Sequence, residues 1–479
     1  MWNRDTLYHL VQEKLGKRLF IVVSNREPYV HTIESGALKW HKPVSGLTEA
    51  LDPIMRASGG VWIAQGSGAA DRQSVDKKDR VNVPPDNPAY ALRRVWVTGE
   101  DNQGFYSGFA NSALWPLCHI AFVPPVFKDT DWQAYQKVNR IFADAVMEEI
   151  GKRDTDAVVL VQDYHFALLP LYLKEKRPRL KVGQFWHIPW PPYEVFRTCP
   201  WHEEILEGML GNDLLGFHTR AYCRNFIDSA RRSGLKNIHT RVAAFPISVD
   251  FEAINEHSAS EDVAKEMDKL RHEYRLDGKF IGVGMDRLDY TKGIPEKLCA
   301  FEKFLEENPA CRGKIVLIEA GMPSRTEIDT YQQVNRKIEE LTDGINARWG
   351  KSDYRPVIQI NRQISSEEMN ALRRLAHFCV VSSLDDGMNL VAKEFVAARG
   401  DENGVLILSK FTGAAAELTD ALLINPYDTA GFAAKIKEAL EMPDAEKRRR
   451  MKIMRRKVAK NNIYKWGADI VSRLMEISK

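Results

Sequence analysis

Cysteine is scarce in this sequence, and its spacing marks neither a disulfide framework nor a metal site. The six cysteines among 479 residues are Cys118, Cys199, Cys223, Cys299, Cys311 and Cys379. Several lie in apolar runs, where a buried thiol is the simplest interpretation. Scattered, unpaired cysteines are typical of proteins that stay in a reducing compartment. We therefore expect a cytoplasmic protein that has no metal site.

Long apolar runs, a signal peptide and an excess of one charge are also missing. The N-terminal residues, Met1-Trp-Asn-Arg-Asp-Thr6, lack the basic and apolar regions of a signal peptide. No apolar run is long enough to cross a bilayer. The 68 basic and 65 acidic residues give a net charge of +3, which argues against a nucleic-acid partner. We also find no internal repeat or low-complexity tract, and we expect no membrane partner.

The chain is too long for one ordinary core, so two domains are expected. Short apolar runs alternate with helical segments in both halves, which is the pattern of parallel sheets in an α/β protein. The boundary is expected between about residues 251 and 279, where Asn255–Arg275 predicts one charged helix closed by Gly278. We further expect a polar loop over His31–Lys42 and a long basic helical region over Ala445–Lys479.

One stretch late in the chain carries the strongest local signal for a ligand site. Phe378–Val381 predicts a buried strand, Ser382–Gly387 a polar turn, and the residues that follow a helix. In an open α/β sheet, such a loop lies at the carboxyl edge, where ligands bind. Gly387 lets backbone N–H groups approach an anion, and Asp386 and Glu394 suit sugar hydroxyls. The pattern favours a nucleotide-sugar site, but an ordinary βα loop with acids near a helix start has the same local pattern.

Ionisable residues follow three other predicted strands. Asp163 and His165 follow one strand, His187 follows the next, and His218 follows a third. A single histidine of this kind is more often a structural residue. Because the carboxyl ends of parallel strands meet at one edge, three such ends favour a shared site.

Three weaker signals lie in the first half of the chain. Arg26 ends the first predicted strand and is either a solvated loop charge or an anion ligand. Gly46 stands just before a helical pattern, so its helix is a second candidate for phosphate binding. The aromatic stretch Phe105–Trp115 has interleaved Asn, Ser and Gly residues, which suits the wall of a sugar pocket as well as a core.

From Arg18 to about Met442 the chain resembles the trehalose-phosphate synthase family of retaining glycosyltransferases. The matching blocks, in order, are Ser24-Asn-Arg26, Trp115-Pro116, Asp163-Tyr-His165, His187-Ile-Pro189, Gly216-Phe-His-Thr219, Asp286-Arg-Leu-Asp-Tyr-Thr-Lys-Gly293, Pro323-Ser-Arg325, Asp386–Glu394 and Asn425-Pro-Tyr427. The resemblance implies the GT-B fold, in which two Rossmann-like domains face each other across a deep cleft. It implies an acceptor-binding domain at 1–255, a nucleotide-sugar-binding domain at 256–455, and a C-terminal helix at 456–479 that returns to the first domain.

The resemblance also implies an activity. The family transfers glucose from UDP-glucose or another NDP-glucose to glucose 6-phosphate, which gives α,α-trehalose 6-phosphate without a metal or another cofactor. The donor and acceptor are then the expected small-molecule partners. The sequence leaves open whether the protein forms a homo-oligomer.

Individual residues match the family's functional positions. The resemblance assigns Arg287 and Lys292 to the donor diphosphate, where two cations would neutralise charge on the leaving group. It places His187 beside the donor glucose, to orient a hydroxyl or share positive charge, and Asp386 at the sugar hydroxyls. The implied donor-binding residues are Gly46, Met388, Asn389, Leu390, Val391 and Glu394. The implied acceptor-binding residues are Arg26, Tyr106, Trp115, Asp163 and Arg325, and the two arginines among them would hold the acceptor phosphate.

Three departures from the family pattern leave the acceptor and the nucleotide base open. Gln65 stands where the family usually has Trp, Asp385 where it has Arg, and Ser45-Gly46 where it often has two glycines. The segment Arg26-Glu-Pro-Tyr29 also resembles glucosylglycerol-phosphate synthases, whose acceptor is glycerol 3-phosphate. A third alternative is a non-catalytic sugar-phosphate sensor, against which the presence of the charged donor residues argues.

Overall fold

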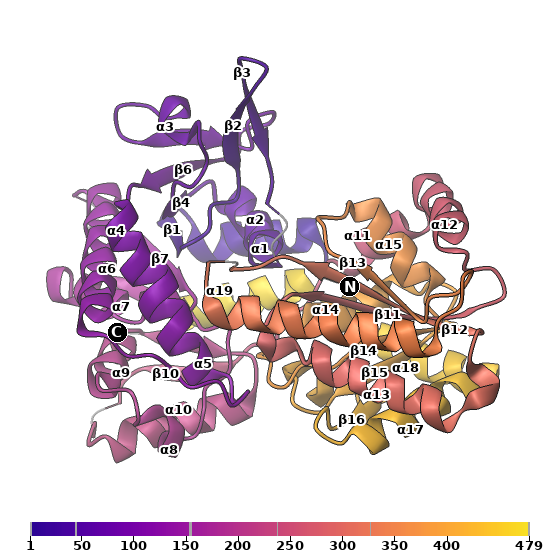
Figure 1. Cartoon of the computed structure of the whole chain (residues 1–479). Coiled ribbons are helices and arrows are strands. Elements are labelled where there is room, and N and C mark those ends of the chain that lie inside the picture. The colour runs from indigo at the N-terminus through magenta and orange to yellow at the C-terminus, as the bar shows by residue number, and fades with distance from the viewer. Residues whose placement is uncertain (1, 44–45, 153–155, 237, 326, 478–479) are drawn as a thin grey trace. The chain divides into compact units, whose positions relative to one another are not determined.

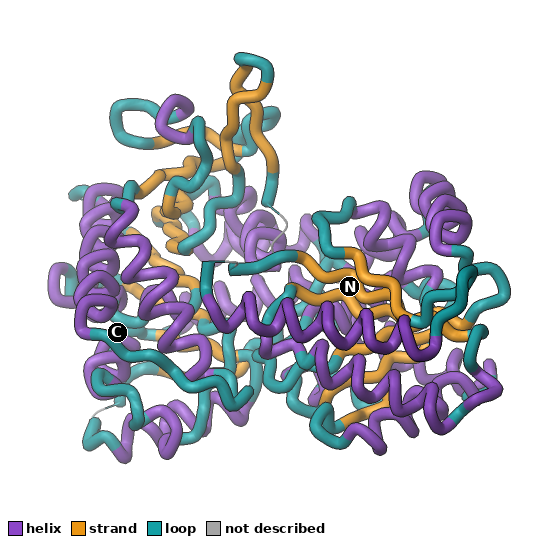
Figure 2. Tube along the Cα trace, viewed as in Figure 1, coloured by secondary structure: helices purple, strands orange, loops and turns teal. Residues whose placement is uncertain are grey.

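The computed structural model describes residues 2–43, 46–152, 156–236, 238–325 and 327–477. Its contacts divide the chain into two compact units, one of Met1–Ile247 with Ile463–Lys479 and one of Ser248–Asn462 (Figure 1). Each unit is built on a mainly parallel sheet with helices packed against it (Figure 2). This is the α/β architecture of Rossmann-like domains.

The sheet of the first unit has the strand order β10-β9-β8-β7-β1-β4-β6-β5, and all neighbours except β5 and β6 are parallel. Its strands are β1 (Leu19–Ser24), β4 (Val61–Gln65), β5 (Arg80–Val83), β6 (Tyr90–Val95), β7 (Ala157–Gln162), β8 (Lys181–Phe185), β9 (Leu214–Phe217) and β10 (Arg241–Ala244). From β1 the chain builds outward through β4 and β6, then returns to place β7 on the other side of β1. The strand order therefore reverses between β1 and β7, and ligands bind at such a point in doubly wound sheets.

Helices cover this sheet and include the C-terminal one. They are α1 (Arg4–Leu15), α2 (Gly46–Ser58), α3 (Asp71–Ser74), α4 (Gly99–Asn102), α5 (Trp115–Cys118), α6 (Asp129–Ile150), α7 (Leu169–Lys176), α8 (Tyr193–Phe196), α9 (His202–Leu210), α10 (Arg220–Arg232) and α19 (Ile463–Glu476). Helix α19 packs on α1, α2, β8 and β9. Lys181 Nζ donates to the carbonyl of Ile477 at 2.8 Å. The end of the chain thus completes the first unit.

The sheet of the second unit is wholly parallel, in the order β13-β12-β11-β14-β15-β16. Its strands are β11 (Phe280–Arg287), β12 (Ile315–Met322), β13 (Val357–Ile360), β14 (Phe378–Val381), β15 (Val405–Ser409) and β16 (Leu422–Ile424). The order reverses between β11 and β14. Strands β11 and β14 are both buried along most of their length, which explains why each is an almost continuous apolar run in the sequence.

Two groups of helices pack around the second sheet. One consists of α13 (Ile294–Glu307), α14 (Asp329–Trp349) and α17 (Thr429–Glu441), and the other of α11 (Phe251–Ser258), α12 (Glu261–Tyr274), α15 (Ser366–Leu375), α16 (Leu390–Ala398) and α18 (Asp444–Lys460). Phe301 of α13 and Ile338 of α14 share a core cluster with Leu317, Phe378 and Ile407 of the strands. This core joins these helices to the sheet.

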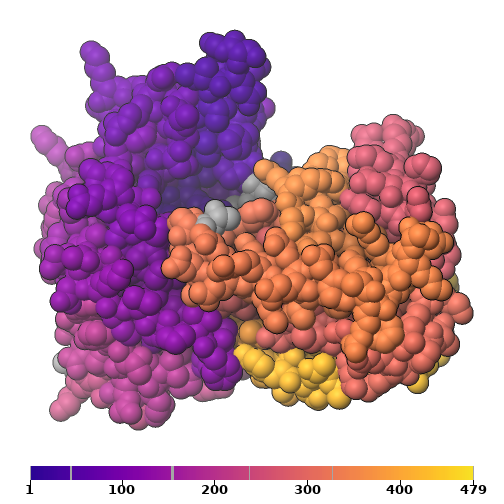
Figure 3. Space-filling model, in the orientation of Figure 1, coloured from indigo at the N-terminus to yellow at the C-terminus, as the bar shows by residue number. Residues whose placement is uncertain are grey.

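The expected loop at His31–Lys42 is wrong, because the chain forms a hairpin of β2 (Val30–Glu34) and β3 (Ala37–His41) there. Ser35 and Gly36, with φ of 51° and 77°, make the two-residue turn that matches the twist of paired strands. Every residue of β3 is exposed, so no buried face marks the strand in the sequence. In the space-filling view the hairpin belongs to the indigo projection of the first unit (Figure 3).

Two expected long helices are each divided in the structure. The segment 255–275 spans α11 and α12, with Ser260 as the new N-cap, and the left-handed C-cap is Arg275 rather than Gly278. The C-terminal region forms α18 and α19, which belong to different units. Residues 248–255, expected in the first domain, count with the second because α11 packs on α15, α16 and α18. Residues 456–462, expected in the returning helix, also count with the second unit.

Close packing of β11 against β14 yields a stability prediction. A Cβ added at Gly282 would lie 2.3 Å from Cζ of Phe378, which is buried. Gly282→Ala should therefore lower the free energy of unfolding by about 1–3 kcal/mol, the usual cost of overpacking. The control Gly344→Ala lies in α14 with open space around it. It should raise the free energy of unfolding by about 0.5–1 kcal/mol. Urea unfolding measures both, and equal stability of the two variants would contradict the packing argument.

Candidate active site

The loops after β11 and β14 form the centre of a candidate site in the second unit. Arg287 ends β11, Lys292 follows five residues later, and Asp386 lies in the loop after β14. Gly293 has φ of 61°, and a Cβ there would lie 2.2 Å from the carbonyl oxygen of Ser382. Only glycine fits such an approach, so this residue brings the two loops together.

Asp386 is held by several donors. Lys292 Nζ lies 2.6 Å from Asp386 Oδ2, and the two side chains are 13% and 14% exposed. Ser383 Oγ and Asn389 Nδ2 each lie 3.2 Å from the same oxygen. These contacts fix the carboxylate in one orientation, where it can accept hydrogen bonds from hydroxyls.

Helix α16 begins at Leu390, four residues after Asp386. Asn389 is its N-cap, with φ of 79°, and its side-chain oxygen accepts from the N–H of Ala392 at 3.0 Å. The carbonyl of Met388 accepts from the N–H of Ala414 at 2.8 Å. Leu390 and Val391 form the first helical turn, whose positive end attracts anions. The predicted donor residues of this stretch therefore surround one helix N-terminus.

Asp289 is a buried carboxylate that lies among several cations. It was not among the site residues predicted from the sequence. Arg287 Nη2 lies 3.4 Å from its Oδ2, and Arg325 Nη1 lies 3.7 Å from the same oxygen. Burial would raise the pKa of Asp289, but Arg287, Arg325 and Lys292 together hold that pKa below its ordinary value. Arg325 also contacts the hydroxyl of Tyr331 and has φ of 48°, a strained value for a residue with a side chain.

Three further ion pairs of the second unit, in two separate places, were not predicted. Glu394, on α16, pairs with Arg373 of α15. Lys297 is fully buried between Asp286 Oδ2 at 3.1 Å and Glu319 Oε2 at 2.8 Å, and Asp286 directly precedes Arg287 in the chain. Burial would lower the pKa of Lys297, but the two carboxylates raise it above its usual value, so the amine stays charged. Local sequence patterns carry no signal for any of these pairs.

In the first unit, the strand ends of β7, β8 and β9 meet. Asp163 follows β7 with φ of 71°, and its Oδ1 accepts from the N–H of His187 at 3.1 Å. His218 Nε2 lies 3.0 Å from the carbonyl of His187. The structure thus brings together the residues that the strand pattern placed at one edge.

The surroundings of His187 favour the neutral form of its imidazole. Its Nε2 lies 2.9 Å from Gln162 Oε1, and its ring packs near Phe185, His218 and Trp466. Burial, followed by the neighbouring His218 and His165, lowers the pKa of His187 well below its usual value. The ring is therefore suited to orienting a hydroxyl rather than to sharing positive charge.

The remaining predicted residues of the first unit lie on separate elements. Tyr106, on a π-helix at Gln103–Leu114, stacks on His165 with ring centroids 5.8 Å apart. Trp115 begins α5 and packs on Tyr164. Arg26 is exposed and lies just after β1, one of the two strands between which the strand order of the first sheet reverses. Gly46 is the exposed first residue of α2, and Ser45 lies outside the described residues.

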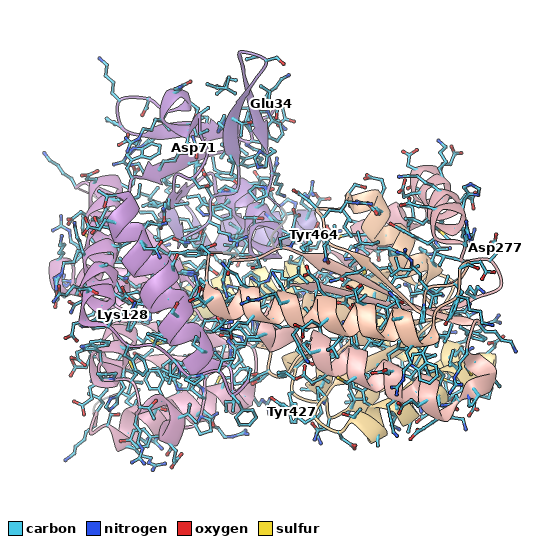
Figure 4. All side chains as sticks on the ribbon, viewed as in Figure 1. Glu34, Asp71, Lys128, Asp277, Tyr427 and Tyr464 are labelled. Atoms are coloured by element: carbon cyan, nitrogen blue, oxygen red, sulfur yellow. The ribbon has the colours of Figure 1, made fainter. Side chains whose placement is uncertain are left out.

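A network of buried charged residues begins at Glu27, the residue after Arg26. Arg94 of β6 is fully buried, with Nε 2.7 Å from Glu27 Oε2 and Nη2 2.9 Å from Asp71 Oδ1. The same Nη2 lies 2.8 Å from His31 Nδ1. Figure 4 shows Asp71 beside the hairpin whose end carries Glu34. The network joins the loop after β1 to the hairpin, α3 and β6.

The network also reaches the loop beside Gln65, one of the departures from the family pattern. Ser67 donates from its N–H to Glu27 Oε1 at 2.9 Å and from its hydroxyl at 2.8 Å. Gln65 Nε2 donates to Asn102 Oδ1 at 3.0 Å. Arg26 therefore directly precedes Glu27 of the network, and Gln65 lies two residues before Ser67.

Within the part of the chain that the structure describes, no helix is both long and apolar enough to cross a membrane. The same residues contain no group of three or more His, Cys, Asp or Glu side chains that could hold a metal ion.

The fold is that of a GT-B glycosyltransferase. Residues 18–476 match glycosyltransferase family 20, and the chain belongs to that family. It is 38% identical over 481 residues to the trehalose-6-phosphate synthase of Mycolicibacterium paratuberculosis, and the alignment covers 96% of each chain.

Solved structures agree with this placement. The E. coli trehalose-6-phosphate protein bound with UDP-2-fluoro glucose is 29% identical, with a TM-score of 0.86 over 96% of this chain and 99% of that one. The α,α-trehalose-phosphate synthase (UDP-forming) of Burkholderia xenovorans in complex with glucose-6-phosphate is 30% identical. Its TM-score is 0.84 over 95% of this chain and 99% of that one.

The network that begins at Glu27 predicts a pH dependence of stability. Burial, followed by the neighbouring Asp71, raises the pKa of Glu27 from 4.5 to about 7. Because the folded value exceeds the unfolded one, this group stabilises the fold fully below about pH 4.5 and loses that contribution as the pH rises through about 7. Glu27→Gln cannot ionise. The wild-type unfolding free energy, relative to that variant, should fall by about 2–3 kcal/mol between pH 5 and pH 8.

Urea unfolding at the two pH values measures this change. His31, whose pKa burial lowers, contributes to both proteins and cancels in the difference. The control Glu148→Gln removes a carboxylate that is 66% exposed and pairs with Arg93, and it should show no such change. A wild-type-to-variant difference that is the same at both pH values would contradict the prediction.

Proposed function

We propose that this protein transfers glucose from UDP-glucose to glucose 6-phosphate and forms α,α-trehalose 6-phosphate with retention of configuration. The observation that carries the proposal is the set of cations around Asp289, at the point where the strand order of the second sheet reverses. A diphosphate and a sugar phosphate both need such charge. The full-length relatives named as trehalose-6-phosphate synthases support it, as does the relative solved with glucose-6-phosphate.

The donor is assigned to the second unit. Arg287 and Lys292 hold the diphosphate, and residues 388–391, at the start of α16, bind phosphates and sugar through their backbone. In the described state these cations contact Asp289 and Asp386, so the diphosphate competes with carboxylates that are already in place. Asp386 takes sugar hydroxyls, and Glu394 takes the ribose. Gly46, on α2 of the first unit, is also assigned to the donor phosphate.

The reaction breaks the bond between C1 of glucose and the β-phosphate oxygen, and it forms a bond from C1 to the acceptor hydroxyl oxygen. The acceptor proton passes to the leaving phosphate oxygen on the same face of the sugar. Arg287 and Lys292 neutralise the charge that develops on the diphosphate, which is the role a metal ion plays in other transferases. We therefore propose that the reaction needs no metal. His187, neutral at pH 7, orients a hydroxyl of the donor glucose.

The acceptor is assigned to Tyr106, Trp115 and Asp163, with Arg26 and Arg325 at its phosphate. Guanidinium groups suit this anion because they donate two parallel hydrogen bonds. We also propose a cytoplasmic location, since the six cysteines are scattered along the chain without the spacing of a disulfide framework, which fits a reducing compartment.

The test of acceptor identity is UDP release from UDP-glucose with either glucose 6-phosphate or glycerol 3-phosphate at matched concentrations. We expect release with glucose 6-phosphate at least about 100-fold faster, because each charged hydrogen bond that a poorly fitting acceptor loses costs about 1.5–3 kcal/mol. A preference for glycerol 3-phosphate would show that Gln65 and its neighbours redirect the acceptor site. Release with neither acceptor would overturn the proposed activity.

Arg325→Ala tests the phosphate assignment. It should raise the KM for glucose 6-phosphate by about 10–100-fold, since one charged hydrogen bond is worth about 1.5–3 kcal/mol. The KM for UDP-glucose should change far less. The control Arg348→Ala lies on α14, where Arg348 is 58% exposed and pairs with Glu302 and Glu306. It should leave both constants unchanged. An unaltered acceptor KM in Arg325→Ala would remove the residue from the acceptor site.

A further inference from the structure

We propose that Arg373 is a positioning residue that fixes the carboxylate of Glu394 to read the ribose diol of the nucleotide donor. The inference rests on the proposed function, because it takes Glu394 as the residue that binds the donor ribose. Arg373 lies outside the sequence blocks that match the family, and a line of polar contacts holds it in place.

The ion pair of Arg373 and Glu394 is largely buried and lies near the N-terminal end of α16. Arg373 Nη2 contacts Glu394 Oε2, and the two side chains are 7% and 27% exposed. Among the described residues, Glu394 Oε1 accepts no hydrogen bond. The guanidinium therefore occupies one carboxylate oxygen and leaves the other for a ligand hydroxyl.

Arg373 is itself held from two sides. Its Nη1 donates to Asn370 Oδ1 at 2.9 Å, and Asn370 Nδ2 lies 3.1 Å from His257 Nδ1 of α11. The carbonyl of Arg373 accepts from Arg399 Nη1 at 3.0 Å. His257 Nε2 lies 3.5 Å from Glu367 Oε1. A line of polar contacts thus runs from α16 through α15 to α11, all within the second unit.

This arrangement suits recognition of a diol. Glutamate side chains rotate freely when unpaired, and ordering one for a ligand costs free energy. Arg373 orders Glu394 before the ligand arrives, so hydrogen bonds from ribose hydroxyls are made without that cost. If Arg373 is removed, the affinity should fall for ligands that carry the hydroxyls and much less for ligands that lack them.

The experiment compares the dissociation constants of UDP and 2′,3′-dideoxy-UDP by calorimetry on the full chain. Wild-type protein should bind UDP about 10–100-fold more tightly than the dideoxy compound, as charged hydrogen bonds require. Arg373→Met should weaken UDP binding by about 10-fold and dideoxy-UDP binding by less than about 2-fold, since only the former uses the ordered carboxylate. A general structural defect would weaken both ligands alike.

The matched control is Arg362→Met. Arg362 lies just before α15 and makes its own arginine–glutamate pair with Glu368 at 2.7 Å, but it is 50% exposed. This variant should keep the wild-type ratio of the two constants. If Arg373→Met does not fold, Arg373→Lys carries the test, because it keeps the charge and loses the fork. Its ratio should be smaller than that of wild type.

Two outcomes overturn the inference: Arg373 variants that keep the wild-type ratio, or wild-type protein that does not distinguish the two ligands. Failure of the proposed function has a different signature. A protein that distinguishes the ligands through Arg373 but releases no UDP with either acceptor would overturn the activity and leave the positioning role of Arg373 in place.

Discussion

The candidate site of the second unit depends on one buried carboxylate. Asp289 gives Arg287 and Arg325 a common counter-charge, and Lys292 contributes to its low pKa. Without it, like charges held so close together would repel in a setting with little water. Asp386 does the same for Lys292 on the other loop. The anionic substrates of the proposed reaction would then meet cations that are already ordered. Such cations can stabilise the charge that develops in the transition state without first having to reorganise.

Topology decides where this charge is placed. In both sheets the chain starts near the middle, builds to one side and returns to the other, so two loops diverge at the carboxyl edge. Arg287 and Asp386 follow the two strands beside this point in the second unit. Arg26 and Asp163 do so in the first. The same construction therefore places a different set of residues at the carboxyl edge of each sheet.

The sequence drew attention to residues of these loops but not to the residues that support them. Arg287, Lys292 and Asp386 lie in blocks that are recognisable along the chain. Arg94 and Glu27, which are 67 residues apart, are visible as a pair only when β6 and the loop after β1 are folded together. Arg373 likewise carries no local signal, because nothing in α15 alone shows that it faces Glu394 of α16. The hairpin was missed for a different reason, since its second strand has no buried face.

Local pattern was sufficient wherever burial acts on consecutive residues. Central strands such as β7 and β14 are continuous apolar runs because they are buried along their whole length. The loops that follow them are polar because they lie at the edge of the sheet. Tertiary structure alone decided which charges pair. Lys292 meets Asp386 across 94 residues only because β11 and β14 are neighbours. An ion pair depends on the distance between two side chains, and that distance follows from strand order rather than from separation along the chain.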